Sequence, residues 1–397
     1  MLAGNLNVQD RLEDIFSRIM RKLREKFLSL QKFFMKSNDF LSPSQIAWRR
    51  YKKNVAGMIS LVFIVLCALT ALFAYFIIPD NTPDANTQIL EISTQKPGFE
   101  VDILLVNKPT KVEKVGFFKK LWSGQPSPYR QIPVDSVKFG EKTTIAYIFN
   151  PEHEGAVQEE VVDNSLLPEN PVVHRKYILG TDQFGRDFLS RLVLGARISL
   201  SVGFIAVVLS VVIGLFVGGL GGFFRGRVDD VAMWLVNVVW SLPTLLIVIA
   251  ITFALGKGVV QVFIAVGLTM WVEVARVARG QILSIRETTF VEAGRALGFK
   301  NARIILRHII PNIINPIIVI SAANFATAIL LEAGLSFLGI GVQPPMPSWG
   351  SMIKENYAYI ILDDAYLAVL PGIAIMLLVL AFMLMGNALR EALNVKK

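Results

Sequence analysis

Long uncharged apolar runs alternate with polar segments along this chain of 397 residues. The first run, residues 55–78, reads VAGMISLVFIVLCALTALFAYFII and contains no charged residue. At about 1.5 Å per residue, a helix of that length exceeds the roughly 30 Å hydrocarbon core of a bilayer. The pattern predicts an all-α polytopic membrane protein with six transmembrane helices, and the other five are expected at about 198–222, 231–255, 258–275, 313–333 and 367–387.

Composition agrees with a membrane protein, and the basic residues predict its orientation. The chain is 53% hydrophobic and 18% charged, whereas a soluble domain carries about 25% charged residues. Many Lys and Arg residues lie in 1–54, ending in WRRYKKN just before the first run, so the N-terminus is expected in the cytoplasm. Six crossings then put the C-terminus and the loop 276–312 inside, and 79–195 outside. The net charge of +9 is attributed to cytoplasmic loops and not to nucleic-acid binding.

Two segments differ from the membrane core. Within the cytoplasmic region 1–54, residues 8–36 repeat apolar positions at helical spacing among basic ones. This amphipathic helix lies either on the membrane face or against a partner or the rest of the chain. Residues 79–178 contain short β-like runs at 101–106 and 143–149 and predict a β-rich extracytoplasmic insertion. The remaining 179–397 would be the core with five membrane helices.

Small residues recur every four positions along the second predicted membrane helix. Residues spaced in this way stack on one helix face and let another helix approach closely. The pattern predicts helix packing, either within this chain or with a homologous partner. The residues are Ala206, Ser210, Gly214, Gly218 and Gly222.

The cytoplasmic loop contains a short, strongly punctuated helix. Thr289 and Glu292 have the spacing of a capping box, and Gly298 suits the left-handed position just after a helix. A helix of about eight residues is marginal alone in water, so something must support it. A second helical piece at about 302–309 is expected to stop near Pro311.

One face of this short helix is apolar and small, and the other is charged. Phe290, Ala293, Gly294 and Leu297 share the first face, and Glu292 and Arg295 lie on the second. The pattern favours a docking element for another protein. An interfacial helix resting on its own membrane domain is the alternative.

Polar residues within the membrane segments are candidates for a translocation path, because such groups usually face the protein interior or water. Hydrogen bonding between helices is the favoured explanation for the asparagines. Glu273 and Arg276 are three residues apart and are expected to pair, while Pro243 and Pro316 can kink helices. The path candidates are Asn237, Trp240, Ser241 and Asn324.

The cytoplasmic loop resembles the conserved loop of ABC-importer permeases, whose pattern is Glu-Ala-Ala, three residues, Gly, nine residues, Ile, any residue, Leu-Pro. Here the loop reads EAGRALGFKNARIILRHIIP. Glu292, Ala293, Gly298 and Pro311 match, while Gly294 replaces the second Ala, His308 the Ile and Ile310 the Leu. His at this place is usual in the peptide and nickel branch. The segments AWRRYKKN (47–54), GTDQFGRDFLSRLVLGARISL (180–200) and LEAGLSFLGIGVQPPMPSWG (331–350) resemble the second permease of oligopeptide and dipeptide importers.

This resemblance, which covers about 40–80 and 175–395, implies the type I ABC importer permease fold and a place in a bacterial inner membrane. It implies ATP-driven import of oligopeptides, with dipeptides, nickel and nickel chelates as alternatives. The expected partners are a second permease, two cytoplasmic ATPase subunits and an external peptide-binding protein. An ion-coupled carrier or an intramembrane enzyme is disfavoured, because repeats, G-x-S-x-G and H-E-x-x-H are all missing from the sequence.

The resemblance also assigns roles. The segment 289–298 would be the coupling helix, and ATP and Mg²⁺ would bind in the partner ATPases, because this sequence contains no G-x-x-x-x-G-K-[ST]. No catalytic or metal site is expected in the chain. Direct contact with the binding protein, or ordering of the outer mouth, is expected from Asp182, Arg186, Asp187 and Trp349. The coupling residues are Thr289, Phe290, Glu292, Ala293, Gly294, Arg295, Leu297, Gly298 and Pro311.

Overall fold

The computed structural model describes residues 42–110, 112–150 and 158–393. The chain divides into two compact units, and the first contains the described residues 42–54 and 391–393. In this unit, α2 (Pro43–Lys53) begins after Ser42, whose side chain accepts a hydrogen bond from the Gln45 backbone and whose own backbone N–H donates to the Gln45 side chain. This reciprocal capping fixes the start of the helix. The amphipathic segment predicted at 8–36 lies outside the described residues.

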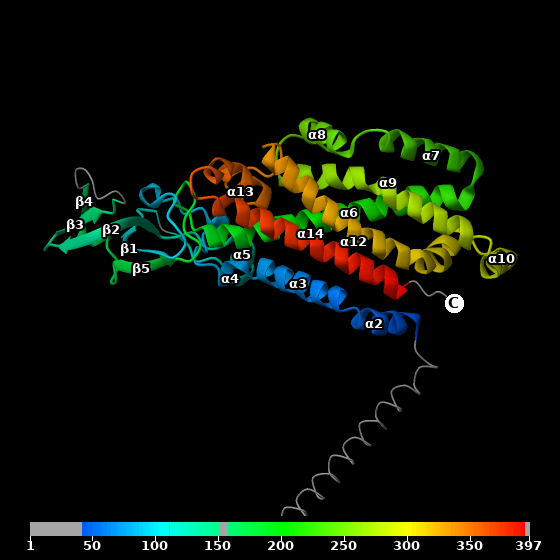
Figure 1. Cartoon of the computed structure of the whole chain (residues 1–397), viewed down its shortest axis with the longest axis horizontal. Coiled ribbons are helices and arrows are strands. Elements are labelled where there is room, and N and C mark those ends of the chain that lie inside the picture. Colours follow the sequence, from blue (N-terminus) through cyan, green and yellow to red (C-terminus); the bar gives the residue numbers. More distant parts are fainter. Residues whose placement is uncertain (1–41, 111, 151–157, 394–397) are drawn as a thin grey trace, which may run out of the picture. The chain divides into compact units, whose positions relative to one another are not determined.

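The second unit, 55–390, contains the long apolar helices (Figure 1). Among the described residues, five helices are long and apolar enough to cross a membrane, or up to six if one bent pair counts as a span. The first predicted run divides into α3 and a short α4 (Ala74–Ile77). The five are α3 (Val55–Leu72), α6 (Phe188–Phe224), α9 (Val259–Ile285), α12 (Ile310–Phe337) and α14 (Tyr366–Leu393).

The predicted third membrane helix at 231–255 is not a continuous helix, and it counts as a span only if its two bent parts are taken together. This segment forms α7 (Gly226–Trp240) and α8 (Thr244–Leu255), which are bent by 91° relative to each other. Pro243 is the residue that precedes α8. Proline lacks a backbone N–H and disfavours the helical conformation of the residue before it, which accounts for the break at this position.

Pro311 does not end a helix as predicted. After α11 (Asn301–Ile304), residues Ile305–Ile309 form a π-helical turn that runs directly into α12. Pro311 occupies the first turn of α12, directly after Ile310, whose backbone N–H donates to the carbonyl of Ile305 across the π-helical turn. Pro316 also lies inside α12.

The row of small residues on α6 packs against α9 of the same chain. A side-chain carbon at Gly214 would lie 2.6 Å from Cβ of Val274, and one at Gly222 would lie 3.0 Å from the carbonyl oxygen of Arg279. A carbon at Gly218 would collide with the backbone of Ala275. The glycines therefore permit close contact of two helix backbones, and of the two predicted packing partners the structure has the one within the chain.

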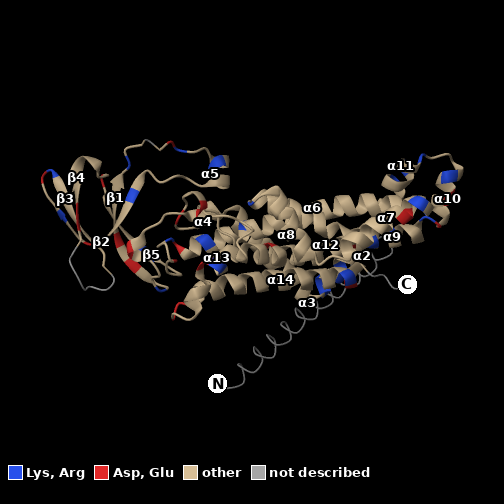
Figure 2. Cartoon of the chain, turned by 90° about the horizontal axis from the view of Figure 1, so that it is seen from above, with Lys and Arg blue, Asp and Glu red and all other residues tan. Residues whose placement is uncertain are grey.

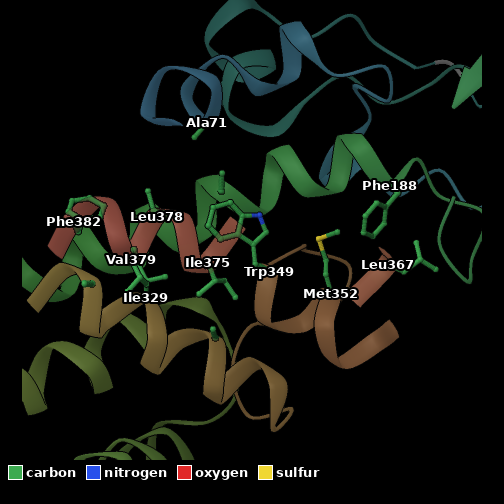
Figure 3. Close-up of a cluster of buried hydrophobic side chains, with 13 residues drawn as sticks. Ala71, Phe188, Ile329, Trp349, Met352, Leu367, Ile375, Leu378, Val379 and Phe382 are labelled. Carbon is green, nitrogen blue, oxygen red and sulfur yellow. The ribbon is translucent and has the colours of Figure 1, made fainter. Parts of the chain in front are cut away.

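A large apolar cluster joins α6, α12 and α14 (Figure 3). Phe188 of α6, Ile329 of α12 and Phe382 of α14 are all buried in it. Trp349, at the start of α13 (Trp349–Asn356), is buried there too and donates its indole N–H to the carbonyl of Leu192 at 2.9 Å. The short η6 (Tyr357–Ile360) then leads to α14.

The insertion is β-rich, as predicted. Its described part forms a five-stranded antiparallel sheet in the order β4-β3-β2-β1-β5, with a bulge in β2 near Ser136. Short helices η2 (Pro83–Ala85), η3 (Leu90–Ile92), α5 (Phe117–Ser123) and η4 (Asn164–Leu166) accompany it. Within 55–390, the sheet lies at one end of the helices and α10 (Thr289–Ala296) at the other (Figure 1). The strands are β1 (Phe99–Asn107), β2 (Tyr129–Phe139), β3 (Thr143–Ile148), β4 (Glu159–Asp163) and β5 (Val172–Tyr177).

Candidate functional site

The predicted docking helix exists as α10, but it begins differently from the prediction. Thr289 is its first helical residue, and Thr288 is the N-cap without a side-chain capping bond. The Thr288 hydroxyl instead donates to the carbonyl of Ile285, at the end of α9. The capping box of Thr289 and Glu292 is therefore wrong, because the helix starts immediately after a turn that already engages the available hydroxyl.

The end of α10 agrees with the prediction. Gly298 has φ +75°, a left-handed conformation that glycine adopts without strain. The backbone N–H of Phe299 donates to Gly294 at 3.0 Å, and that of Gly298 donates to Arg295 at 2.9 Å. These two bonds form a Schellman motif, which satisfies carbonyls at the end of the helix. The chain direction after α10 is therefore set by a defined C-cap.

The inner side of α10 is seated on the ends of several long helices. Val291 is buried in one apolar cluster with Phe223 of α6, Ile282 of α9 and Ile313 of α12. The guanidinium of Arg295 lies over the Phe223 ring, 5.4 Å from its centroid. Because these contacts come from α6, α9 and α12, a displacement of α10 would act on the ends of all three helices.

Ionic contacts reinforce this seat. Arg286, just after α9, donates to the Phe223 carbonyl at 2.5 Å, and Arg225 pairs with Glu287. Arg279 of α9 makes a two-point contact with the carboxylate of Asp229 in α7, at 2.5 and 2.6 Å. Bidentate arginine–carboxylate contacts are geometrically specific. The turn between α6 and α7 is thus connected to α9 where the loop begins.

The outer side of α10 presents an exposed apolar strip. Leu297 is 72% exposed and Phe290 is 44% exposed, and Ala293 between them is also exposed. Gly294, predicted on the same face, is buried at its inner edge. Basic residues lie on α10 and α11 (Figure 2). A helix held by one side and apolar on its free side is suited to insertion into a groove of another protein.

Comparisons with known proteins identify the family. Residues 210–395 match the model for the binding-protein-dependent transport system inner membrane component, and 42–97 match that for the N-terminal TM domain of oligopeptide transport permease C. A glutathione transport system permease protein of Pectobacterium atrosepticum is 37% identical over 238 residues, which are 60% of this chain and 78% of the relative. A dipeptide transport system permease protein of Alkalihalophilus pseudofirmus is 40% identical over 217 residues, 55% of this chain and 71% of the relative.

The chain belongs to the permease subunits of binding-protein-dependent ABC importers. The resemblance to the branch that contains oligopeptide permease C is thereby confirmed. A solved structure of the MetNI methionine ABC transporter in inward-facing conformations also aligns, with a TM-score of 0.44 and 19% identity, covering 52% of this chain and 98% of that one.

In this permease, Gly294→Ala is expected to leave the fold intact and to stabilise it slightly. A carbon at Gly294 would lie 3.5 Å from the Phe299 ring, an ordinary contact distance. Alanine favours a helix interior over glycine by about 0.5–1 kcal/mol. Gly298→Ala is the matched control and should lower stability by roughly 1–2 kcal/mol, because residue 298 is left-handed. Thermal unfolding of the purified permease measures both, and a larger loss at 294 than at 298 would contradict this account.

The predicted path residues of the permease lie in two places. Asn237, Trp240 and Ser241 lie at the end of α7, beside the break before α8, and all three are exposed. Asn324 is buried in α12, and its Nδ2 has no hydrogen-bond partner among the described residues. The expected pairing of Glu273 with Arg276 is wrong. Among the residues that the structure describes, Arg276 instead stacks over the Trp240 ring, with the guanidinium 3.6 Å from the centroid.

The four residues expected to meet a binding protein are nearly fully buried: Asp182, Arg186, Asp187 and Trp349. Arg186 contacts Asp182 and Glu355, both at 2.7 Å. Asp187 caps α6 by accepting from the Ser190 backbone at 2.9 Å, and burial raises the pKa of its carboxyl. These buried side chains order the loops that carry them.

Sequence reasoning missed one buried member of this polar region, Arg191. Arg191 is almost completely buried and lies 3.5 Å from Asp182 and 3.6 Å from Glu355. Nearby in the helices, Glu332 of α12 accepts from Ser336 at 2.7 Å and from Ser199 at 3.3 Å. Arg191 and Glu355 are far apart in sequence and show no motif spacing. The only available signal was that GTDQFGRDFLSR ends in a second arginine.

Proposed function

We propose that this permease is the transmembrane subunit of an ATP-driven peptide importer, in which α10 docks on a cytoplasmic ATPase. The observation that carries the proposal is the two-sided character of α10. Val291 and Gly294 face the helix ends of the permease, while Phe290, Ala293 and Leu297 are left exposed. A free surface helix of eight residues would be marginal, so the seat on the permease provides the rigidity that a lever requires.

Transmission of motion follows from the contacts beneath α10. A movement of the ATPase surface would displace Val291 and Arg295 against Phe223, and so act on the end of α6. The contact of Arg279 with Asp229 would carry the displacement to α7. Packed interfaces tend to have discrete arrangements, so nucleotide-driven motion would favour one of two access states. ATP and Mg²⁺ would be bound by the ATPases, and this chain would supply the gate.

The orientation is part of the same proposal. If α10 meets a cytoplasmic ATPase, the end of the helices that carries α10 is cytoplasmic. The five-stranded sheet lies at the opposite end of the 55–390 unit (Figure 1) and would then be outside the cytoplasm, as would the loops ordered by Asp182 and Arg186. The basic residues near α10 agree with the positive-inside tendency of cytoplasmic loops. The termini would lie in the cytoplasm, and an external binding protein would deliver the solute.

The translocation path would run at the interface with a second, similar permease. The end of α7, with Asn237, Trp240 and Ser241, is a candidate lining because it is polar, exposed and next to a break in helical structure. Asn324 is a second candidate because its buried amide has an unsatisfied donor among the described groups. Two ATPases, the second permease and a peptide-binding protein complete the proposed complex.

Oligopeptides are the proposed solutes, and dipeptides or glutathione are the alternatives that the relatives favour. The test is uptake into vesicles that contain the complete complex and its binding protein. Labelled tetrapeptide, dipeptide, glutathione and nickel are compared with ATP present and absent. We expect tetrapeptide to accumulate only when ATP is present. This accumulation should continue when a protonophore collapses the proton gradient.

Each contrary outcome has a separate meaning. Accumulation that needs the proton gradient and not ATP would contradict the importer mechanism and favour an ion-coupled carrier. ATP-dependent accumulation of dipeptide, glutathione or nickel without tetrapeptide would leave the mechanism in place and overturn the assignment of oligopeptides.

A further inference from the structure

Helix α5 (Phe117–Ser123) in the insertion exposes aromatic side chains that nothing within the described chain covers. Phe118 is 83% exposed and Trp122 is 71% exposed. They are four residues apart and therefore lie on one side of the helix. Phe117 is exposed next to them, with its ring 5.7 Å from that of Phe118. This cluster of aromatic residues is unusual for a segment of a water-exposed domain.

The aromatic cluster adjoins the end of the first membrane segment. The Phe117 ring lies 5.4 Å from the ring of Phe76 in α4, and Nζ of Lys120 lies 5.2 Å from the Phe76 centroid. Directly before α4, α3 carries a run of exposed apolar side chains, which includes Ile59 and Leu66. The apolar surface of α3 thus continues through Phe76 onto α5, at the level where the membrane helix ends.

Contacts made by the α5 backbone fix this position. Arg197 of α6 donates to the carbonyls of Leu121 and Trp122, at 3.2 and 3.0 Å, and its guanidinium lies 4.4 Å from the Trp122 ring centroid. The Gln125 backbone N–H donates to Asn81 at 2.9 Å. Between them, Gly124 has φ +73°, and a carbon there would lie 2.6 Å from the Asn81 carbonyl oxygen. The helix is held at the membrane end by these contacts, while Phe118 and Trp122 remain largely exposed.

Basic side chains border the aromatic cluster. Lys114 and Lys119 are exposed, and Lys120 is half-buried beside them. Aromatic and basic residues together are typical of segments that lie at the interface between headgroups and acyl chains, where the rings are buried and the ammonium groups meet anionic lipids.

We propose that α5 is a membrane-surface anchor, with Phe118 and Trp122 inserted into the headgroup layer beside the end of α3. The occupant of this face is lipid, because the face continues the lipid-exposed surface of a membrane helix and carries the charge that complements anionic headgroups. The anchor holds the insertion at the bilayer surface, so that the sheet keeps a fixed orientation relative to the membrane. The proposal rests on membership of an inner membrane family and is independent of the solute and of ATPase coupling.

The test measures the environment of α5 in the complete complex, embedded in nanodiscs of phosphatidylethanolamine and phosphatidylglycerol. Spin labels are attached at F118C and, separately, at W122C, in a background in which the single native cysteine is replaced by C67A. F139C is the matched control, because Phe139 is an aromatic residue of the same insertion, on β2, and is 61% exposed. Accessibility is measured to oxygen, which partitions into lipid, and to a water-soluble nickel chelate.

We expect the ratio of oxygen to nickel accessibility to be several-fold higher at 118 and 122 than at 139. Nickel accessibility at 118 and 122 equal to that at 139 would overturn the proposal, because the face would then be in water. Exclusion of both reagents would also overturn it, since a protein partner would then cover the face. Using two labelled positions guards against a label that perturbs α5 itself, and co-isolation of the other subunits confirms that each labelled permease is assembled.

Discussion

Replacing Gly218 by alanine is expected to prevent the permease from assembling in a stable form. The added carbon would collide with the backbone of Ala275 in α9, and a helix backbone cannot move aside as a flexible side chain can. Excess volume in a packed interior costs about 1–3 kcal/mol and sometimes more, and here it would separate the two helices along the row from Gly214 to Gly222. The measurements are the yield of monodisperse permease after detergent extraction and its thermal unfolding.

The neighbouring residue provides the control. Gly219 lies on the same helix, and a carbon there would lie 4.0 Å from Cδ1 of Ile282. Gly219→Ala should therefore be neutral, or slightly stabilising because alanine favours the helix. If both variants lose yield and stability to the same extent, the close approach of α6 and α9 is not the reason that residue 218 must be glycine.

The features that the sequence predicted well depend on local chemistry. Apolar runs located α3, α6, α9 and α14, because length and composition alone determine whether a segment can cross a bilayer. The row of glycines indicated close packing because a four-residue period always lies on one helix face. Gly298 indicated the end of α10 because glycine accepts the left-handed conformation there without strain.

The predictions that failed depended on context. Hydropathy cannot detect the break between α7 and α8, since the two helices together are long and apolar enough to pass for one span. Pro311 was interpreted as a stop, although a π-helical turn lets the chain continue through it. Sequence spacing pairs the Arg276 guanidinium with the Glu273 carboxylate, but the fold places it over the Trp240 indole.

Long-range polar contacts were beyond prediction for a related reason. Arg186 and Arg191 approach Glu355 only after α13 folds back against α6. No local spacing carries that information, so the sequence could suggest that GTDQFGRD is charged and ordered but not that its side chains are buried. Local spacing predicts the exposed strip on α10. The packing of α10 against Phe223 and Ile313 is a long-range contact and required the structure.

Leu297→Asp is expected to abolish association with the ATPase subunits while the permease itself remains folded. Leu297 is 72% exposed and lies at the end of α10, so the change removes little internal packing, and exposed substitutions usually alter stability by less than about 0.5 kcal/mol. Within a docked interface the same side chain would be buried. An unpaired carboxylate buried there would cost several kcal/mol, and each 1.4 kcal/mol lowers affinity about tenfold.

Co-isolation of the ATPases with the tagged permease, and ATP-dependent uptake in vesicles, measure the effect of Leu297→Asp. We expect at least a ~100-fold loss of affinity, which corresponds to about 3 kcal/mol, and uptake at the background level. Ile361→Asp is the matched control, because Ile361 is 88% exposed but lies in the loop before α14.

Unchanged co-isolation in Leu297→Asp would remove the docking role of α10, because no other apolar strip on this helix could replace it. Loss in both variants would indicate that an added charge disturbs assembly in general. Loss in Leu297→Asp alone, with normal unfolding of the isolated permease, would identify the exposed strip of α10 as the surface that receives the ATPase motion.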